Sequence, residues 1–212
     1  MQGKGNAEDA RKQLRLSFRK KRKALSACQQ ENAAHNIVKM AVEHDLFVNI
    51  GRVALYISHD GELDTQHLIN YLWEQEKEVY LPVLHPFCAG YLVFLRYSKN
   101  SPMTYNKFGI LEPVLDVTKL CPLNKLGLIL TPLVAFDESG NRLGMGGGFY
   151  DRTLQFLRGN NDNSGALESN SSINQIKIIG LAHDVQKTLS LPIEVWDIPL
   201  PEILTPSNMY SF

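Results

Sequence analysis

Hydrophobic positions along the 212-residue chain follow two spacings, which divide it into helices and strands. Near the start, Leu14, Phe18 and Leu25 recur at helical spacing, which predicts an amphipathic first helix. Ser26 is then suited to cap a second helix over 27–44. Further helices are predicted at 66–77, where Asp64 or Thr65 can act as the cap, and at 151–158, closed by Gly159.

Strands are predicted where apolar residues alternate or run together over a short stretch. These stretches are 52–58, 78–84, 91–97, 126–136 and 176–182. The first half of 126–136 has the continuous apolar character of a central parallel strand. Because strands alternate with helices, the sequence predicts an α/β fold, a three-layer Rossmann-like domain with a largely parallel sheet. We expect a single domain over 1–212, with a flexible insertion at 159–175 where Asn and Ser predominate.

Composition narrows the class of protein without identifying it. Lys and Arg together number 22, as do Asp and Glu, so no net charge points to nucleic acid or a membrane as a partner. The 3 cysteines form no CxxC pair, which fits a reducing compartment. The first residues contain no apolar run and no stretch approaches about 18 consecutive apolar residues, so we expect neither a signal peptide nor a membrane span. We therefore expect a cytoplasmic protein, and a monomer, because no predicted element has a large spare apolar face.

A glycine-rich loop is the most unusual feature of the sequence. Five glycines fall within 140–148, and Phe149, Tyr150 and Asp151 follow directly. Loop glycines cost folding entropy, so a cluster indicates that the backbone approaches a ligand closely. Phosphate is a frequent ligand, because free N–H groups in a turn form an anion-binding nest. A P-loop pattern is absent, and Phe149 stands where a dinucleotide-binding GxGxxG pattern needs its last glycine. The alternative is a tight turn that binds nothing.

Charged residues on either side of this loop suggest its chemistry. Arg142 can clamp a phosphate, and Asp151 can hold Mg²⁺ beside it. Asp151 is equally suited to cap the helix that follows. No Ser-His-Asp or Cys-His arrangement indicates a protein nucleophile, and the pair His59-Asp60 is consistent with ordinary loop polarity.

The stretch TPLVAFDESGNRLGMGGGFYDRTL, residues 131–154, resembles the signature of the 5-formyltetrahydrofolate cyclo-ligases, also called methenyltetrahydrofolate synthetases. The similarity extends to the Leu14-Arg15 pair in the basic first helix, and to three further segments. These are YISHDGELDT at 56–65, FGILEP at 108–113 and VWDIPLP at 195–201. It covers nearly the whole chain apart from the first residues and the insertion. The scaffold that it implies is similar to that of sugar-phosphate isomerases and CoA transferases.

The resemblance implies an ATP-dependent ligase that closes a ring in 5-formyltetrahydrofolate, with or without a polyglutamate tail. The products would be 5,10-methenyltetrahydrofolate, ADP and phosphate. A formamide oxygen is a poor leaving group, and its phosphorylation would activate the carbon for attack by N10. Such phosphoryl transfer needs positioning and charge stabilisation from the protein. ATP and Mg²⁺ are the cofactors implied.

The resemblance also implies which residues bind ATP and metal. Arg142, Tyr150 and Asp151 would be catalytic, and Asp151 with Asp197 would hold Mg²⁺. Helical geometry places residues four apart on one face, which supports Arg11 and Arg15 as a pair. The full ATP set comprises Arg11, Lys12, Gln13, Leu14, Arg15, Arg142, Leu143, Gly144, Met145, Gly146, Gly147, Gly148, Phe149 and Tyr150.

For the folate, the resemblance implies Ile57, Glu62, Met145, Gly146, Gly147, Gly148 and Phe149. A pterin edge presents an N–H and an amino group side by side, and the carboxylate of Glu62 is a natural acceptor for both. Phe149 can stack on a flat ring. The chain departs from the family pattern at Met145 and Gly147, where many relatives carry basic residues. It departs again at Arg11, where Lys is common, and at Phe149, where Tyr is more frequent.

Two other functions compete with the ligase. The uncharged loop is also consistent with a folate- or nucleotide-binding protein on the same scaffold that has little turnover. The basic first helix is consistent with RNA binding, although the chain lacks a basic stripe interleaved with aromatics. Within that helix, we expect the charged run 19–23 to be solvated.

Overall fold

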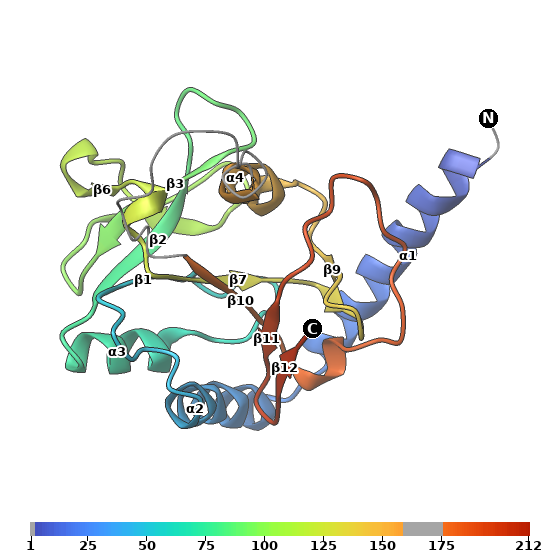
Figure 1. The fold of residues 1–212 in the computed structure, drawn as a ribbon, viewed down its shortest axis with the longest axis horizontal. Coiled ribbons are helices and arrows are strands. Elements are labelled where there is room, and N and C mark those ends of the chain that lie inside the picture. Colours follow the sequence, from blue (N-terminus) through green and yellow to red (C-terminus); the bar gives the residue numbers. More distant parts are fainter. Residues whose placement is uncertain (1–2, 159–175) are drawn as a thin grey trace, which may run out of the picture.

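A computed structural model describes residues 3–158 and 176–212, with side chains for 8–155 and 176–212. Within these ranges one sheet has eight strands in the order β12-β11-β10-β7-β1-β2-β3-β6 (Figure 1). The strands from β11 to β2 run parallel, and β12, β3 and β6 are antiparallel to their neighbours. The bounds are β1 Arg52–Ala54, β2 Glu78–Leu84, β3 Leu92–Tyr97, β6 Leu120–Cys121, β7 Leu128–Pro132, β10 Lys177–Leu181, β11 Glu202–Leu204 and β12 Met209–Ser211. The expected largely parallel α/β sheet is confirmed.

Helices cover both faces of this sheet and complete the three expected layers. α2 (Ala27–Glu43) and α3 (Gln66–Glu74) lie on one face, and α4 (Phe149–Arg158) lies on the other (Figure 1). Ser26 caps α2 as expected: its hydroxyl accepts from Gln29 N, and its own N–H donates to Gln29 Oε1 at 2.8 Å. No helix in the described part of the chain is long and apolar enough to cross a membrane.

Two short hairpins and three single turns complete the described elements. One hairpin joins β4 (Met103–Tyr105) to β5 (Leu111–Pro113), and the other joins β8 (Ala135–Phe136) to β9 (Arg142–Leu143). The turns are η1 Val117–Lys119, η2 Leu123–Lys125 and η3 Asp184–Gln186. Both hairpins stand outside the main sheet, and both contribute to the pocket described below.

The core explains why the strands have this character. Ile37 of α2 and Leu68 of α3 pack in one cluster with Val53 and Leu128 of the central strands. Side chains that alternate with these along the strands, such as Ile129, join a second cluster on the opposite face. A strand buried on both faces must be apolar throughout, which is why 126–132 is a continuous apolar run.

Several predicted boundaries differ from the structure. The strand predicted at 52–58 ends at Ala54, and the stretch 126–136 divides into β7 and the start of the β8–β9 hairpin. α4 begins at Phe149, so Asp151 lies inside its first turn and the prediction that it caps the helix is wrong. The predicted insertion at 159–175 and the predicted helix end at Gly159 lie outside the described residues.

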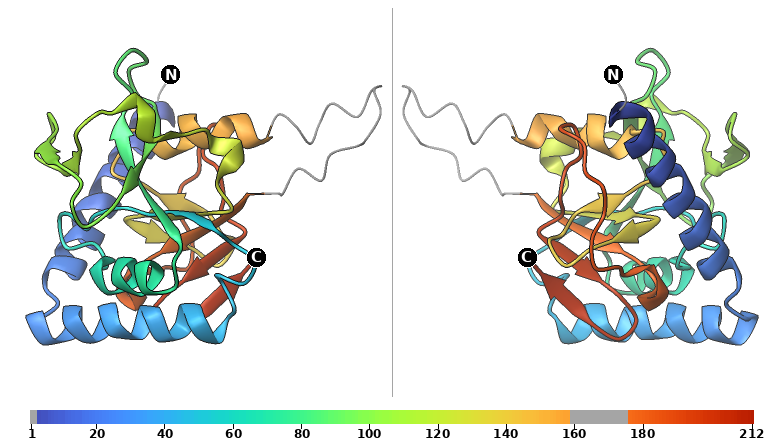
Figure 2. Two further views of the ribbon diagram at one scale, coloured as in Figure 1. Left: turned by 90° about the vertical axis from the view of Figure 1, so that its left-hand side faces the viewer. Right: turned by 90° about the vertical axis from the view of Figure 1, so that its right-hand side faces the viewer.

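The first helix, α1 (Gly3–Lys23), packs along η3 and β8 at one end of the sheet (Figure 2). The expectation that 19–23 is solvated is wrong for Arg22, whose side chain is fully buried. Its guanidinium donates to the Asp60 carbonyl at 2.9 Å, to Asp60 Oδ2 at 3.1 Å and to the Leu133 carbonyl at 3.2 Å. These bonds join the end of α1 to the loops that follow β1 and β7.

We predict that Arg22→Gln lowers the free energy of unfolding by about 3 kcal/mol or more, because it removes the buried partner of two carboxylates. Urea denaturation measures the loss. Lys20→Gln, an exposed change on the same helix, is the control and should alter stability by less than about 0.5 kcal/mol. Equal losses in the two variants would contradict the anchoring role of Arg22.

Candidate active site

A pocket of about 450 Å³ opens at the carboxyl ends of β1 and β7. In a doubly wound α/β fold this edge of the sheet is where ligands bind. Three segments contribute much of its lining: the loop after β1, the glycine-rich loop that leads into α4, and the β4–β5 hairpin. The lining includes Tyr56, Ile57, Glu62, Asn106, Phe108, Glu112, Leu133, Arg142, Gly144, Met145, Gly147, Gly148, Phe149, Tyr150 and Asp151. Most of the predicted folate residues therefore meet in one cavity.

The glycine-rich loop adopts backbone conformations that favour glycine. Gly146 has φ of 98° and Gly148 has φ of 63°, both in the left-handed region. At Gly147, a side-chain Cβ would lie 2.7 Å from the Phe149 ring. The loop leads directly into α4, whose first backbone N–H groups have no partner within the helix. Loop and helix end together form a backbone surface suited to an anion.

Arg142 is placed beside this loop by the β8–β9 hairpin. The carboxylate of Asp137 fixes the hairpin, accepting from Ser139 N at 3.0 Å and from Asn141 N at 3.1 Å. Arg142 lies on β9, with its side chain only 4% exposed, and donates to Asp151 Oδ1 at 2.6 Å. A buried guanidinium needs an anionic partner, and the carboxylate of Asp151 supplies it.

Arg15 and Arg11 reach the neighbourhood of the loop from α1. Arg15 donates through Nε to the Gly144 carbonyl at 2.9 Å, and burial, with Arg11 second, lowers the pKa of its guanidinium. Arg11 is buried and binds both carboxylate oxygens of Asp197, one of them at 2.9 Å. It also donates to the Pro192 carbonyl at 2.8 Å. The predicted pair on one helix face is therefore present, with each arginine holding a different segment.

The other predicted α1 residues have different positions. Lys12 and Gln13 are exposed, while Leu14 packs beside Phe18 in a hydrophobic cluster. Leu143 is buried in the same cluster. Among the described residues that line the pocket, none of these four is included. Their predicted contact with ATP stays a prediction.

Glu62 and Tyr150 are two polar residues that line the pocket. Burial raises the pKa of Glu62 to about 7, against the opposing attraction of Arg22, which lies 3.7 Å from Glu62 Oε1. The second carboxylate oxygen accepts from His59 N at 3.1 Å. The buried Tyr150 hydroxyl has no hydrogen-bond partner within the described part of the chain, and burial, with Glu62 second, raises its pKa. An orphaned hydroxyl inside a cavity is a group that a ligand can satisfy.

Two aromatic rings also line the pocket. Phe149 meets Phe108 of the β4–β5 hairpin edge to face, with ring centroids 5.6 Å apart. The Arg152 guanidinium lies 5.8 Å from the Phe149 ring. Within the hairpin, Glu112 accepts from Asn106 Nδ2 at 2.9 Å, which fixes the side chains that face the cavity.

Sequence reasoning missed several of these residues. Phe108 and Glu112 lie in or beside the FGILEP segment, which matched the family without suggesting a role for either side chain. Asp60 is a hub for Arg19, Arg22 and Lys23, so its interpretation as ordinary loop polarity is wrong. In the sequence, only the basic run 19–23 pointed to these ion pairs. Such a run is consistent either with solvated side chains or with side chains that pair with a nearby acid.

Comparison with known proteins decides the family. A family model described as the 5-formyltetrahydrofolate cyclo-ligase family matches residues 7–206. The chain belongs to the 5-formyltetrahydrofolate cyclo-ligase family. The cyclo-ligase of Escherichia coli K12 is 46% identical over 195 residues, covering 92% of this chain and all of that protein. The cyclo-ligase of Haemophilus influenzae is 48% identical over 194 residues, covering 92% and 96%.

Solved structures agree with this assignment to the cyclo-ligase family. The structure of 5,10-methenyltetrahydrofolate synthetase from Aquifex aeolicus matches with a TM-score of 0.75 and 27% identity, covering 95% of this chain and 92% of that one. A synthetase from Mycoplasma pneumoniae, 22% identical with a TM-score of 0.67 over 92% and 98% of the two chains, has the same fold. The predicted family and the predicted ligase class are confirmed.

The raised pKa of Glu62 predicts a pH-dependent stability. Between the ordinary value of 4.5 and about 7, the unfolded chain loses this proton before the folded one, so stability falls as pH rises. Glu62→Gln keeps a neutral side chain throughout. In urea denaturation, the free energy of unfolding of the variant should therefore rise relative to that of the wild type by about 2 kcal/mol between pH 5 and pH 8.

Glu74→Gln, an exposed change on α3, serves as the control and should keep a constant difference from the wild type across that range. A difference in the free energy of unfolding between Glu62→Gln and the wild type that stays constant from pH 5 to pH 8 would contradict the prediction. It would mean that Glu62 is ionised in the folded protein at every pH tested, so that burial does not raise its pKa.

Proposed function

We propose that the glycine-rich loop and the start of α4 bind the phosphates of ATP, while the adjoining pocket binds the folate. As a cyclo-ligase, the enzyme uses ATP to convert 5-formyltetrahydrofolate into 5,10-methenyltetrahydrofolate. The division of the site into a phosphate part and a folate part rests on the position of the glycine-rich loop. One end of it contacts Arg15 of α1, and the Gly147–Phe149 segment lines the apolar cavity.

In this arrangement the phosphates meet backbone N–H groups and two guanidinium groups. Arg142 is buried beside the loop, and Arg15 already binds one of its carbonyls. Guanidinium groups bind phosphate oxygens through paired hydrogen bonds, and a low-dielectric site strengthens them. The nucleotide would then replace Asp151 as the anionic partner of Arg142.

The carboxylates fit Mg²⁺ to different degrees. Asp151 uses Oδ1 for Arg142 and has 24% of its side chain exposed, so its other oxygen is available to a cation. Asp197 has both oxygens bonded, to Arg11 and to Glu194 N at 2.8 Å, and it would need to exchange Arg11 for the metal. If these carboxylates hold Mg²⁺, the ion would neutralise phosphate charge and orient the transferred group.

The folate would enter the pocket between Glu62 and Phe149. When ionised, Glu62 offers acceptor oxygens to the N–H and amino donors of a pterin edge. Its pKa of about 7 places the ionisation near neutral pH, and the donors of the ligand favour the charged form. The rings of Phe149 and Phe108 supply a flat apolar wall for the folate ring system.

The proposed chemistry needs two bond exchanges and no protein nucleophile. The formyl oxygen attacks the γ-phosphorus of ATP, the bond to the bridging oxygen breaks, and ADP leaves. N10 then attacks the activated carbon, loses its proton, and phosphate departs with the former formyl oxygen. Arg142 stabilises charge on the transferred phosphoryl group, and the orphaned hydroxyl of Tyr150 can donate to a substrate oxygen.

We predict that Asp151→Asn lowers kcat by about 100-fold or more, because the variant loses a charged group at the phosphoryl-transfer site. The assay follows the methenyl chromophore with 5-formyltetrahydrofolate, ATP and Mg²⁺, and omits ATP in parallel. Asp9→Asn, an exposed change on α1, is the control and should leave kcat unchanged. An unchanged kcat in Asp151→Asn would remove Asp151 from the proposed mechanism.

The same assay separates the ligase from a binding protein without turnover. Chromophore formation that requires ATP establishes the ligase for this chain. Folate that binds the wild type, as measured by calorimetry, without forming chromophore would establish the binding protein instead.

A further inference from the structure

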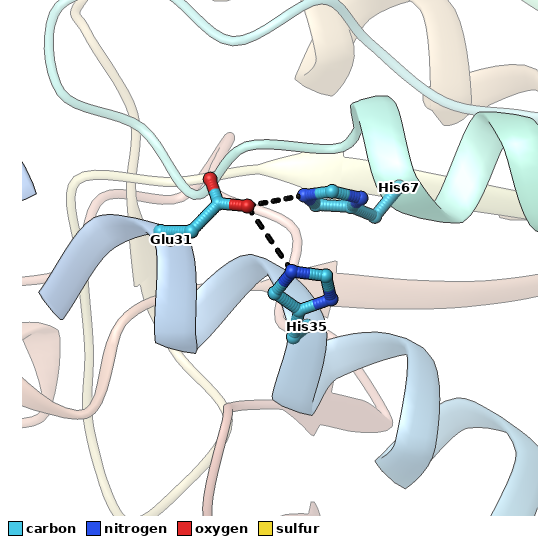
Figure 3. A group of neighbouring side chains, drawn as sticks. All are labelled: Glu31, His35 and His67. Atoms are coloured by element: carbon cyan, nitrogen blue, oxygen red, sulfur yellow. Dashed lines mark hydrogen bonds and ion pairs between the residues drawn. The ribbon is translucent and has the colours of Figure 1, made fainter. Parts of the chain in front are cut away.

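A cluster of two imidazoles and a carboxylate lies on the surface between α2 and α3 (Figure 3). Glu31 Oε1 is 2.8 Å from His67 Nε2 and 3.1 Å from His35 Nε2. The two rings are stacked, with centroids 4.0 Å apart and planes inclined by 28°. The Nε2 atoms of His35 and His67 therefore face the same carboxylate oxygen of Glu31, as Figure 3 shows.

The spacing of these three atoms is close to that of a metal coordination shell. All three ligand atoms lie within 4.8 Å of one another. A tetrahedral zinc with bonds of about 2.0–2.1 Å separates its ligand atoms by roughly 3.3 Å. To reach that separation, the two distances from Glu31 Oε1, 2.8 Å to His67 and 3.1 Å to His35, need to lengthen by only a few tenths of an ångström.

The helices that carry the ligands are held in place by the hydrophobic core. Ile37 of α2 and Leu68 of α3 are fully buried and pack in the same cluster. Glu31 and His35 are one turn apart on α2, and His67 lies in the first turn of α3.

We propose that Glu31, His35 and His67 bind a divalent transition-metal ion, with Zn²⁺ as the best match. Two imidazoles and one carboxylate suit zinc, cobalt, nickel or copper, whereas Mg²⁺ prefers oxygen ligands alone. Solvent supplies the fourth ligand, because the Glu31 and His35 side chains are 59% and 61% exposed. The ion links α2 to α3 on the surface, away from the glycine-rich loop. It stabilises the folded chain because it binds the folded state.

The test uses the full chain without a histidine tag. Zn²⁺ affinity is measured by competition with a chromophoric chelator at pH 7.5, and thermal midpoints are recorded with and without Zn²⁺. The wild type should bind one Zn²⁺ per chain at this site and melt at a higher temperature with it. The double variant His35→Gln/His67→Gln should bind this ion more weakly by about tenfold or more and lose the shift in midpoint.

Two further variants control for other zinc ligands. His44→Gln, at the C-terminal cap of α2, should retain the affinity of the wild type. Cys28→Ser should retain it too, although this exposed thiol lies on the same helix. The proposal is overturned if the double variant binds Zn²⁺ as tightly as the wild type, or if Cys28→Ser alone abolishes binding. The metal-free midpoint of the double variant shows that it is folded.

Discussion

The Asp60 carboxylate is the point on which the arrangement of the site depends. It accepts from Arg19 Nε at 2.7 Å and from Arg22 at 3.1 Å, and it also pairs with Lys23. The hydrogen bond from Arg19, with the other two cations, holds the pKa of Asp60 far below its ordinary value despite partial burial. Three cations near the end of α1 are thereby bound to one ionised loop carboxylate, which fixes α1 against the loop after β1.

This junction sets the position of the groups on both sides of it. Two residues beyond Asp60, Glu62 is directed into the pocket within 3.7 Å of Arg22. Two turns before Arg22, Arg15 contacts the glycine-rich loop. The loop carries no basic residue of its own at Met145 or Gly147, and arginines on neighbouring elements bind its backbone instead. Arg15 does so at Gly144, and Arg152 of α4 does so at Gly147. The positive charge missing from the loop sequence is thus present in its surroundings.

What the sequence could predict was local or periodic. The continuous apolar character of β7 follows from burial on both faces, and the cap at Ser26 uses a partner three residues away. The buried state of Arg22 could not be predicted in the same way, because its partners Asp60 and Leu133 lie 38 and 111 residues further along the chain. In a run of basic residues, solvation is the normal expectation. The family resemblance predicted which segments form the candidate site, and tertiary contacts place Ile57, Glu62 and much of the glycine-rich loop around one pocket.

The ion pairs at the site also indicate what ligand binding has to change. Arg142, 4% exposed, is paired with Asp151, and Arg11 is paired with Asp197, so both buried cations have a carboxylate partner within the protein. A triphosphate bound here would bring further negative charge next to these carboxylates. The repulsion would be unfavourable unless a cation accompanies the triphosphate. In the proposed function, Asp151 would hold a divalent cation that balances this charge. The pairing of Arg142 with Asp151 is therefore a physical reason to expect that the proposed nucleotide site would take up a divalent cation together with its ligand.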